Sequence, residues 1–316
     1  MDSKIEHISN QKSNNYYLSN ANIYILEKTI AITIAILFMF GIPYYIAPKF
    51  WPRNLNPENE LIFACLYGII NHEAIFIFYN LIYYVIYKLE WPYFEKDKNH
   101  EFPWPWKDNY DEWILLLKKS FKVLFFNQFI IVPILIYFST FRKGKASYRL
   151  DYESLPGIIE VTWQLIFCII IESFLFYWSH RFLHCDFLYK HIHKIHHTHK
   201  ITVGIASEYA HPIEFIFGNV LPTNAGMIIL GSKMHAVTFG MWIILRITKT
   251  TDAHSGYGFN WSPGSLIPFG NPLDFHNYHH LYFKGNYGSF LNIWDYMCGT
   301  IDPGYHKFSH SKSKSE

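Results

Sequence analysis

Four long apolar runs constrain this chain more than any other feature of its 316 residues. They are Thr29–Ala47, Leu61–Tyr87, Phe121–Ser139 and Val161–Ser179. The shortest of them has about 19 residues, which at ~1.5 Å per helical residue is enough to cross a ~30 Å hydrocarbon core. Only 16% of the chain is charged, against roughly 25% in an ordinary soluble domain. The sequence therefore predicts an all-α integral membrane protein with about four transmembrane helices.

The runs divide the chain into four regions. Residues 1–22 form a polar N-terminal tail, 23–179 contain the transmembrane helices, 180–305 are rich in histidine, and 306–316 form a polar C-terminal tail. Two later apolar stretches, Phe215–Gly231 and Ala236–Ile247, are short or interrupted, so they could be re-entrant or could cap a head outside the bilayer. If His180 and His276 serve one metal centre, the chain between them crosses the membrane zero times or twice. We expect zero.

Three histidine clusters follow the fourth run. They are His180/His184, His193/His196/His197 and His276/His279/His280. Residues three and four apart share one face of a helix, with Cβ atoms ~5–6 Å apart, so each cluster directs its imidazoles to one side. Eight imidazoles gathered without a cation would leave ring nitrogens unpaired, or would repel one another when protonated. A surface tract could account for His191–His199 alone, but the matching spacing of the second and third clusters favours a metal site.

The ligand types narrow the choice of metal. The His-Glu-x-x-His pattern of zinc peptidases is absent, and no carboxylate lies within the clusters. Eight nitrogens exceed what one ion can hold, so two metals are expected. Imidazole binds iron, zinc and copper well, and two irons beside a membrane helix suit oxygen activation on a lipid. The predicted architecture is four spans with a cytosolic helical cap that holds a histidine-ligated di-iron site.

These clusters resemble the signature of the membrane-bound fatty acid hydroxylase/sterol desaturase superfamily, and the chain is similar within it to the C-4 methylsterol monooxygenases. Further segments that carry the resemblance are Glu208–Pro212, His254–Tyr257, Gly285–Gly288 and Trp294–Tyr296. The similarity covers about Tyr177–Tyr305. Asn260 replaces an expected proline before Trp261, and Phe275 replaces a histidine found in many members. Neither departure removes a cluster histidine.

The resemblance implies roles for individual residues. The eight cluster histidines would be iron ligands, and His254 would join them or donate a hydrogen bond to one of them. His211 would be a further ligand or a structural turn residue. Three acids could orient ligand imidazoles through their second ring nitrogen, or could be ordinary solvated or capping groups: Asp252, Glu208 and Asp295. Four polar residues at membrane depth are expected to pair with one another or to line the substrate path: Glu172, Asn71, His72 and Glu73.

The resemblance also implies a reaction, which is the stepwise oxidation of a sterol C-4 methyl group by O2 in sterol biosynthesis. The chain has no Gly-x-Gly-x-x-Gly fingerprint, four-cysteine iron–sulfur motif or heme-attachment motif, so its electrons must come from another protein. By resemblance they would come from NAD(P)H through cytochrome b5 and its reductase. A sterol C-4 decarboxylase would then act on the product.

The remaining expectations concern location, other partners and alternatives. The ending Lys312–Glu316 resembles an endoplasmic reticulum retrieval signal, which favours a multi-pass protein of that membrane with a cytosolic active site and C-terminus. A net charge of +2 does not favour nucleic acid as a partner. Other reactions of the superfamily stay open: C-5 sterol desaturation, sterol side-chain hydroxylation and fatty acyl/sphingolipid hydroxylation. A non-enzymatic scaffold is a further alternative, although all three histidine clusters are intact.

Overall fold

The computed structural model describes residues 22–139, 144, 146–267 and 269–313, so the expected tail at 1–21 and the last three residues of the retrieval-like ending lie outside it. Within the described residues the protein is helical, with three isolated β-bridges and no extended strand. The elements before residue 158 are η1 (Leu37–Ile46), α2 (Ala47–Phe50), α3 (Pro57–Leu89), α4 (Pro92–Glu95), α5 (Pro105–Asp108), α6 (Tyr110–Phe126), η2 (Asn127–Ile131), α7 (Val132–Ser139) and η4 (Tyr152–Ser154). The later elements are α8 (Ile158–Leu183), α9 (Asp186–His191), η5 (His193–Thr198), η6 (Gly204–Glu208), α10 (Pro212–Glu214), η7 (Phe215–Val220), α11 (Leu221–Leu230), η8 (Gly231–Lys233), α12 (Ala236–Ala253), η9 (Pro263–Leu266), α13 (Leu273–Tyr282), α14 (Ile293–Cys298) and α15 (Pro303–Ser313).

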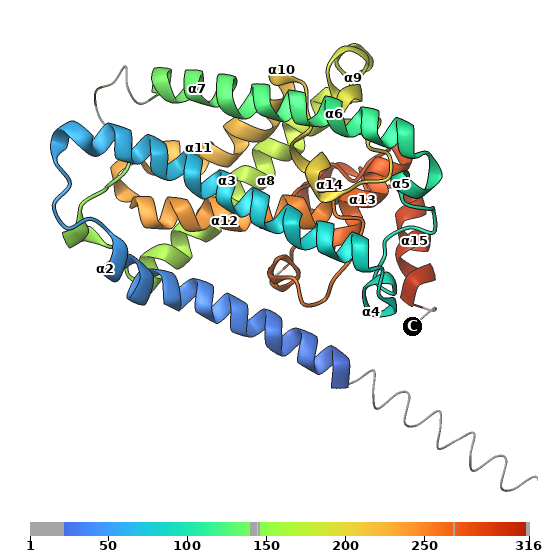
Figure 1. Cartoon of the computed structure of the whole chain (residues 1–316), viewed down its shortest axis with the longest axis horizontal. Helices are drawn as coiled ribbons and strands as arrows, with labels where there is room; N and C mark the ends of the chain where they lie inside the picture. Colours follow the sequence, from blue (N-terminus) through green and yellow to red (C-terminus); the bar gives the residue numbers. More distant parts are fainter. Residues whose placement is uncertain (1–21, 140–143, 145, 268, 314–316) are drawn as a thin grey trace, which may run out of the picture.

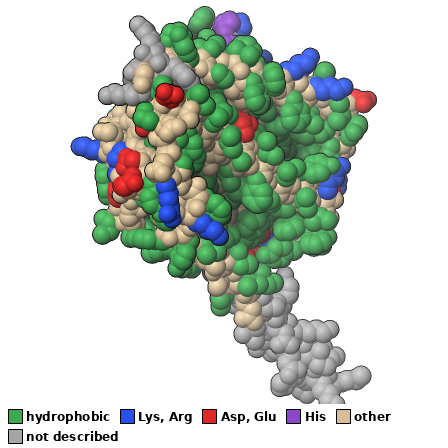
Figure 2. All heavy atoms as spheres, turned by 60° about the vertical axis from the view of Figure 1, so that its left-hand side comes forward, with side chains coloured by type: hydrophobic (Ala, Val, Ile, Leu, Met, Phe, Trp, Pro, Cys, Tyr) green, Lys and Arg blue, Asp and Glu red, His purple; other side chains and the backbone are tan. Residues whose placement is uncertain are grey.

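Five helical segments of the described chain are long and apolar enough to cross a membrane. The four predicted runs lie inside four of them: Asn22–Phe50, Pro57–Leu89, Tyr110–Ser139 and Ile158–Leu183. The fifth, Pro212–Lys233, has 22 residues. Large apolar side chains such as Leu66, Ile70 and Ile166 remain exposed, and Figure 2 shows hydrophobic side chains over most of the visible face. Apolar exposure on this scale is typical of a surface that contacts lipid.

Prolines inside these segments occur at π-helical turns, where the helix widens instead of ending. Pro43 lies within η1, Pro133 follows η2, and Pro222 follows η7. A π-turn accommodates the backbone group that a proline ring would otherwise displace. The helical segments therefore continue past both Pro133 and Pro222.

The segment Pro212–Lys233 runs back along α8, and α12 returns beside it (Figure 1). The Gln164 amide, near the start of α8, donates to the backbone oxygen of Lys233 over 2.8 Å, whereas His180 lies in the last turn of α8. Gly226 permits the close approach, because a Cβ there would lie 2.6 Å from the Cys168 sulfur. The chain between His180 and His276 thus passes along the bundle twice. If both passes cross the bilayer, the number of crossings is two instead of the expected zero and remains even.

Charged side chains limited the apolar stretch recognised in α12 to Ala236–Ile247, whereas the helix continues to Ala253, and each of these charges has a buried partner. Arg246 pairs with Glu172 of α8, with 2.7 Å between Nε and Oε1. Lys249 donates to the backbone oxygen of Asn271 over 2.7 Å. Because its charges are partnered inside the protein, α12 lies between α3 and α8 with most of its residues buried.

Candidate metal centre

The three histidine clusters meet at one end of the bundle, on the right in Figure 1 where α13 begins. His180 lies in the last turn of α8, and His184 is the residue that caps this helix. The second cluster occupies the short 3-10 helix η5, and the third lies on α13. His254 caps the C-terminus of α12, which brings it to the same place. The returning pass of α12 therefore completes the set.

Nine histidines form two groups, and within each group the nearest ring nitrogens all lie within 4.8 Å of one another. The first group contains His180, His184, His193, His197 and His279. The second group contains His196, His254, His276 and His280. Histidines four residues apart belong to the same group, as His193 and His197 do. The histidine three residues after the first member of a cluster, which is His196 or His279, belongs to the other group. The second and third clusters thus each contribute to both groups.

The separations between ring nitrogens match those of ligands around one ion. In the first group, Nε2 of His193 lies 3.0 Å from Nε2 of His184 and 3.0 Å from Nε2 of His197. In the second group, Nε2 of His254 lies 3.4 Å from that of His196 and 3.2 Å from that of His276. Metal–nitrogen bonds of about 2.1 Å at right angles place adjacent nitrogens about 3.0 Å apart. Neither ring nitrogen of His280 has a hydrogen-bond partner within the described residues.

Hydrogen bonds on the opposite ring nitrogen fix how five of these imidazoles point. In each case Nδ1 lies 2.6–3.1 Å from an oxygen atom. The pairs are His180 with the Tyr287 carbonyl, His193 with the Glu214 carboxylate, His196 with the Tyr209 carbonyl, His254 with the Thr250 carbonyl, and His279 with the Gly285 carbonyl. A carbonyl oxygen only accepts, so in those pairs Nδ1 carries the proton and Nε2 is left with a lone pair.

The second group shows why this donor set requires a cation. His196 and His254 both donate Nδ1–H to carbonyls, so their Nε2 lone pairs face each other across 3.4 Å with no proton to share. Burial lowers the pKa of His196 to about 4. Burial and neighbouring imidazoles lower the pKa of His184 to about 2. The rings are therefore neutral at pH 7, which is the state in which imidazole binds a metal, and the donor set fits two metal ions.

Four other residues predicted for the site lie outside both groups. His211 is half-exposed and caps α10, where its Nδ1 accepts from the Ile213 amide over 3.2 Å. Asp252 accepts from Tyr83 over 2.7 Å and from Ser262. Glu208 bonds to His72 over 2.9 Å. Asp295 accepts from the amide of Tyr287 over 2.8 Å, and so supports the loop whose carbonyls hold His180 and His279. It does not contact an imidazole of either group.

The polar residues at membrane depth pair with one another or with residues of other segments. His72 bonds to its neighbour Glu73 over 3.1 Å as well as to Glu208, so two of the four expected residues contact each other. The Asn71 amide donates to the Gly240 carbonyl of α12 over 2.9 Å. Glu172 instead pairs with Arg246, and it accepts from Ser289 over 2.5 Å. His72, Glu73 and Arg246 also face a cavity, described next.

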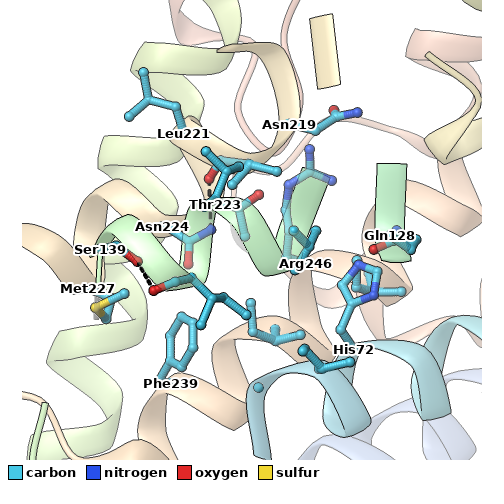
Figure 3. Close-up of a pocket in the computed structure, with 18 of the residues that line it drawn as sticks. His72, Gln128, Ser139, Asn219, Leu221, Thr223, Asn224, Met227, Phe239 and Arg246 are labelled. Atoms are coloured by element: carbon cyan, nitrogen blue, oxygen red, sulfur yellow. Dashed lines mark hydrogen bonds between the residues drawn. The ribbon is translucent and has the colours of Figure 1, made fainter. Parts of the chain in front are cut away.

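A cavity of about 430 Å³ lies between α3, α7, α11 and α12, and Figure 3 shows part of its wall. Its lining is mostly apolar, with side chains such as Ile69, Met227 and Phe239. A second cavity of about 20 Å³ lies against five histidines of the two groups. Three residues line both cavities: Ser207, Asn219 and Thr250. The apolar cavity therefore ends beside the histidines.

Comparisons with known proteins agree with this arrangement. Residues 165–300 match the family model described as fatty acid hydroxylase. A protein of Dictyostelium discoideum, provisionally named a methylsterol monooxygenase, is 35% identical over 266 residues, which are 84% of this chain and 93% of that protein. The chain belongs to the fatty acid hydroxylase family. Within the family it resembles the methylsterol monooxygenases.

Other family members match a shorter part of the chain. Methylsterol monooxygenase 2-2 of Arabidopsis thaliana is 42% identical over 165 residues, covering 51% of this chain and 60% of that protein. A very-long-chain aldehyde decarbonylase of Oryza sativa subsp. japonica is 43% identical over 149 residues, covering 46% and 55%. The chain thus spans little more than half the length of these two relatives. No solved structure matches the chain.

Two buried residues of this fatty acid hydroxylase family member were not predicted for the site. Glu214 accepts from Nδ1 of His193 over 2.8 Å. It lies 21 residues further along the chain, and only its place near His211 and Pro212 could have drawn attention to it. His199 lies outside both groups, and its Nε2 is 2.9 Å from the Ser120 hydroxyl. Burial, followed by the nearby His196, lowers the pKa of His199 to about 3.

Proposed function

We propose that this protein is a membrane-bound monooxygenase that oxidises the C-4 methyl group of sterol intermediates. The observation that carries the proposal is the apolar cavity of about 430 Å³ that ends beside the paired histidine groups. An apolar cavity with a few polar groups at one end suits a lipid of sterol size. The resemblance to methylsterol monooxygenases supports a sterol as that lipid.

Two non-heme irons would complete the site. His180, His184, His193, His197 and His279 would hold one iron, and His196, His254, His276 and His280 would hold the other. When bound, such a pair supplies oxygen activation that protein side chains cannot provide. Glu214 and four backbone carbonyls keep five imidazoles in the orientation and tautomer that ligation needs. The apolar wall of the cavity excludes water and holds the hydrocarbon body of the substrate.

The proposed reaction needs electrons from outside the chain. Each step consumes O2, two electrons and two protons, places one oxygen atom on the substrate carbon and releases the other as water. The first step gives the alcohol, the second gives a gem-diol that loses one water to become the aldehyde, and the third gives the carboxylic acid, which ionises to the carboxylate. NAD(P)H, acting through a reductase and cytochrome b5, would supply the electrons, and a sterol C-4 decarboxylase would consume the acid. We place the protein in the endoplasmic reticulum membrane, with the histidines and the C-terminus on the cytosolic side.

The proposal is tested by expressing the full chain in a yeast strain that lacks its own sterol C-4 methyl oxidase. We expect 4,4-dimethylsterols to decline and C-4-demethylated sterols to appear. The rice relatives favour a second candidate, the conversion of very-long-chain aldehydes. Unchanged sterols with consumption of a supplied C26–C30 aldehyde would favour that candidate. Unchanged 4,4-dimethylsterols with new hydroxylated acyl chains, side-chain hydroxysterols or C-5 desaturated sterols would favour one of the other lipid oxygenases.

A pair of histidine variants tests the metal assignment. His196→Ala should abolish turnover and lower the bound iron, because each ligand supports a site shared by several residues. His211→Ala should keep its iron, since His211 caps a helix outside both groups. Iron is measured by elemental analysis of gently solubilised protein. Normal iron content and activity in His196→Ala would exclude His196 as a ligand.

A further inference from the structure

The cavity contains one amide side chain that has no hydrogen bond within the described part of the chain. Three amide residues line it: Gln128, Asn219 and Asn224. Gln128 donates to Glu208, and Asn224 donates to the Val220 carbonyl over 2.8 Å. Asn219 makes no such side-chain contact, although its amide has both a donor and an acceptor. It is therefore the amide in the cavity wall that remains free to bind a ligand.

Asn219 lies where the apolar cavity meets the histidines. It belongs to the π-turn η7, a kind of turn that is frequent at functional sites. It also lines the small cavity beside His180, His196 and His254. Figure 3 shows the Arg246 side chain extending toward the end of the cavity where Asn219 lies. Arg246 pairs with Glu172 through its Nε, and no hydrogen bond joins Arg246 to Asn219 among the described residues.

We propose that the Asn219 amide binds the oxygen substituent of the substrate, next to the carbon that is oxidised. The inference rests on the proposed function, for which this substituent is the sterol 3-hydroxyl. That hydroxyl is on C-3, which is bonded to C-4, so a C-4 methyl group beside the histidines brings the hydroxyl to the same end of the cavity. A hydroxyl both donates and accepts, and it can satisfy both halves of the amide. One placed polar group in an apolar cavity fixes which end of a lipid enters first.

Asn219 therefore acts as a specificity residue. A substrate without the 3-hydroxyl would leave the amide unpaired in a water-poor cavity, and sites built around a hydrogen bond discriminate strongly against such analogues. Asn224 offers a matched control, because it is an amide of the neighbouring helix α11 that lines the same cavity. Its amide already donates to the carbonyl of Val220, the last residue of η7.

The test compares a 4,4-dimethylsterol with its 3-deoxy analogue in one competition reaction, using membranes that contain the full iron-loaded chain and its reductant. The ratio of products gives the ratio of kcat/KM and does not depend on how much enzyme is folded. The wild-type protein should prefer the hydroxylated sterol by at least about tenfold. Asn219→Leu should reduce the preference to within about threefold, and Asn219→Ser should restore part of it. Asn224→Leu should retain the wild-type preference.

Two outcomes would overturn the inference: equal use of both sterols by the wild-type protein, or the full preference retained in Asn219→Leu. If Asn219→Leu yields too little protein to assay, the inference is decided by Asn219→Ser, which should show a smaller preference than the wild type. Failure of the proposed function looks different, because the wild-type protein would then oxidise neither sterol.

Discussion

Five of the nine imidazoles in the candidate metal centre are held by a hydrogen bond on the ring nitrogen that faces away from the other histidines. In this centre four of those acceptors are backbone carbonyls and one is the carboxylate of Glu214. Such partners fix the ring orientation and raise the basicity of the ligating nitrogen. Glu214 is therefore the side chain outside the histidine set on which the proposed metal binding would depend most directly.

Replacing Glu214 tests this dependence. Glu214→Leu removes the acceptor of the His193 Nδ1–H while keeping a side chain of similar size, so we expect iron affinity or activity to fall by about 10–100-fold. Glu208→Leu is the matched control, because it also removes a buried carboxylate bonded to a histidine, in this case His72. Iron content is measured after dialysis against a series of chelator concentrations. Equal iron loss in the two variants would mean that Glu214 acts through general stability and not through His193.

At the scale of the element, the helices of the centre approach one another through small residues. Gly226 of α11 lies against Cys168 of α8, and a Cβ at this position would meet the sulfur at 2.6 Å and the Cys168 Cα at 3.1 Å. Gly240 of α12 lies similarly against the Tyr67 ring of α3. These two contacts hold the α11–α12 hairpin close to the rest of the bundle, and α12 in turn carries His254 to the metal centre.

Two glycine substitutions test how closely α11 packs against α8. Gly226→Ala should destabilise the protein by about 1–3 kcal/mol, because the new methyl group overlaps Cys168 and forces α11 away from α8. Gly68→Ala, in the middle of α3, should be neutral or slightly stabilising, because no atom lies within 4 Å of its Cβ position. The midpoint of thermal denaturation in detergent reports both effects. Equal midpoints for the two variants would show that α11 and α8 are not tightly packed at Gly226.

The same contacts explain which elements the sequence could predict. Four spans were evident because their outward faces are apolar, and such faces remain exposed in the structure. Only the first part of the returning helix α12 was recognised, as the apolar stretch Ala236–Ile247, because the partners that bury Arg246, Lys249 and Asp252 lie elsewhere in the sequence. The helical spacing identified the histidines that gather but not how they divide, since that depends on the angle at which η5 and α13 meet. The four backbone carbonyls that orient imidazoles could not be predicted, because every residue has a carbonyl and the sequence does not mark these four.

At the scale of the whole molecule, an apolar waist, formed by the middle parts of the long helical segments, separates two polar ends. Loops at one end are joined by the Trp51 indole, which donates to the Leu150 carbonyl over 2.7 Å, and by the ion pair of Arg149 with Glu160. The histidines lie at the opposite end, and the cavity lies between, within the waist. Under the proposed function, a lipid would enter this cavity from the bilayer and reach the histidines without crossing water.

The two passes between His180 and His276 give this arrangement a direct test. Ser232 is exposed at the turn between α11 and α12, and Cys185 is exposed just beyond the last turn of α8. In variants that keep a single cysteine, a membrane-impermeant maleimide applied to sealed vesicles should modify Cys185 and the thiol of Ser232→Cys from opposite sides. Glu58→Cys, at the start of α3, should be modified from the same side as Ser232→Cys, because α3 begins at the end of the molecule where α11 finishes. If Ser232→Cys and Cys185 react from the same side, the hairpin does not cross the bilayer, and α11 and α12 instead belong to the cap.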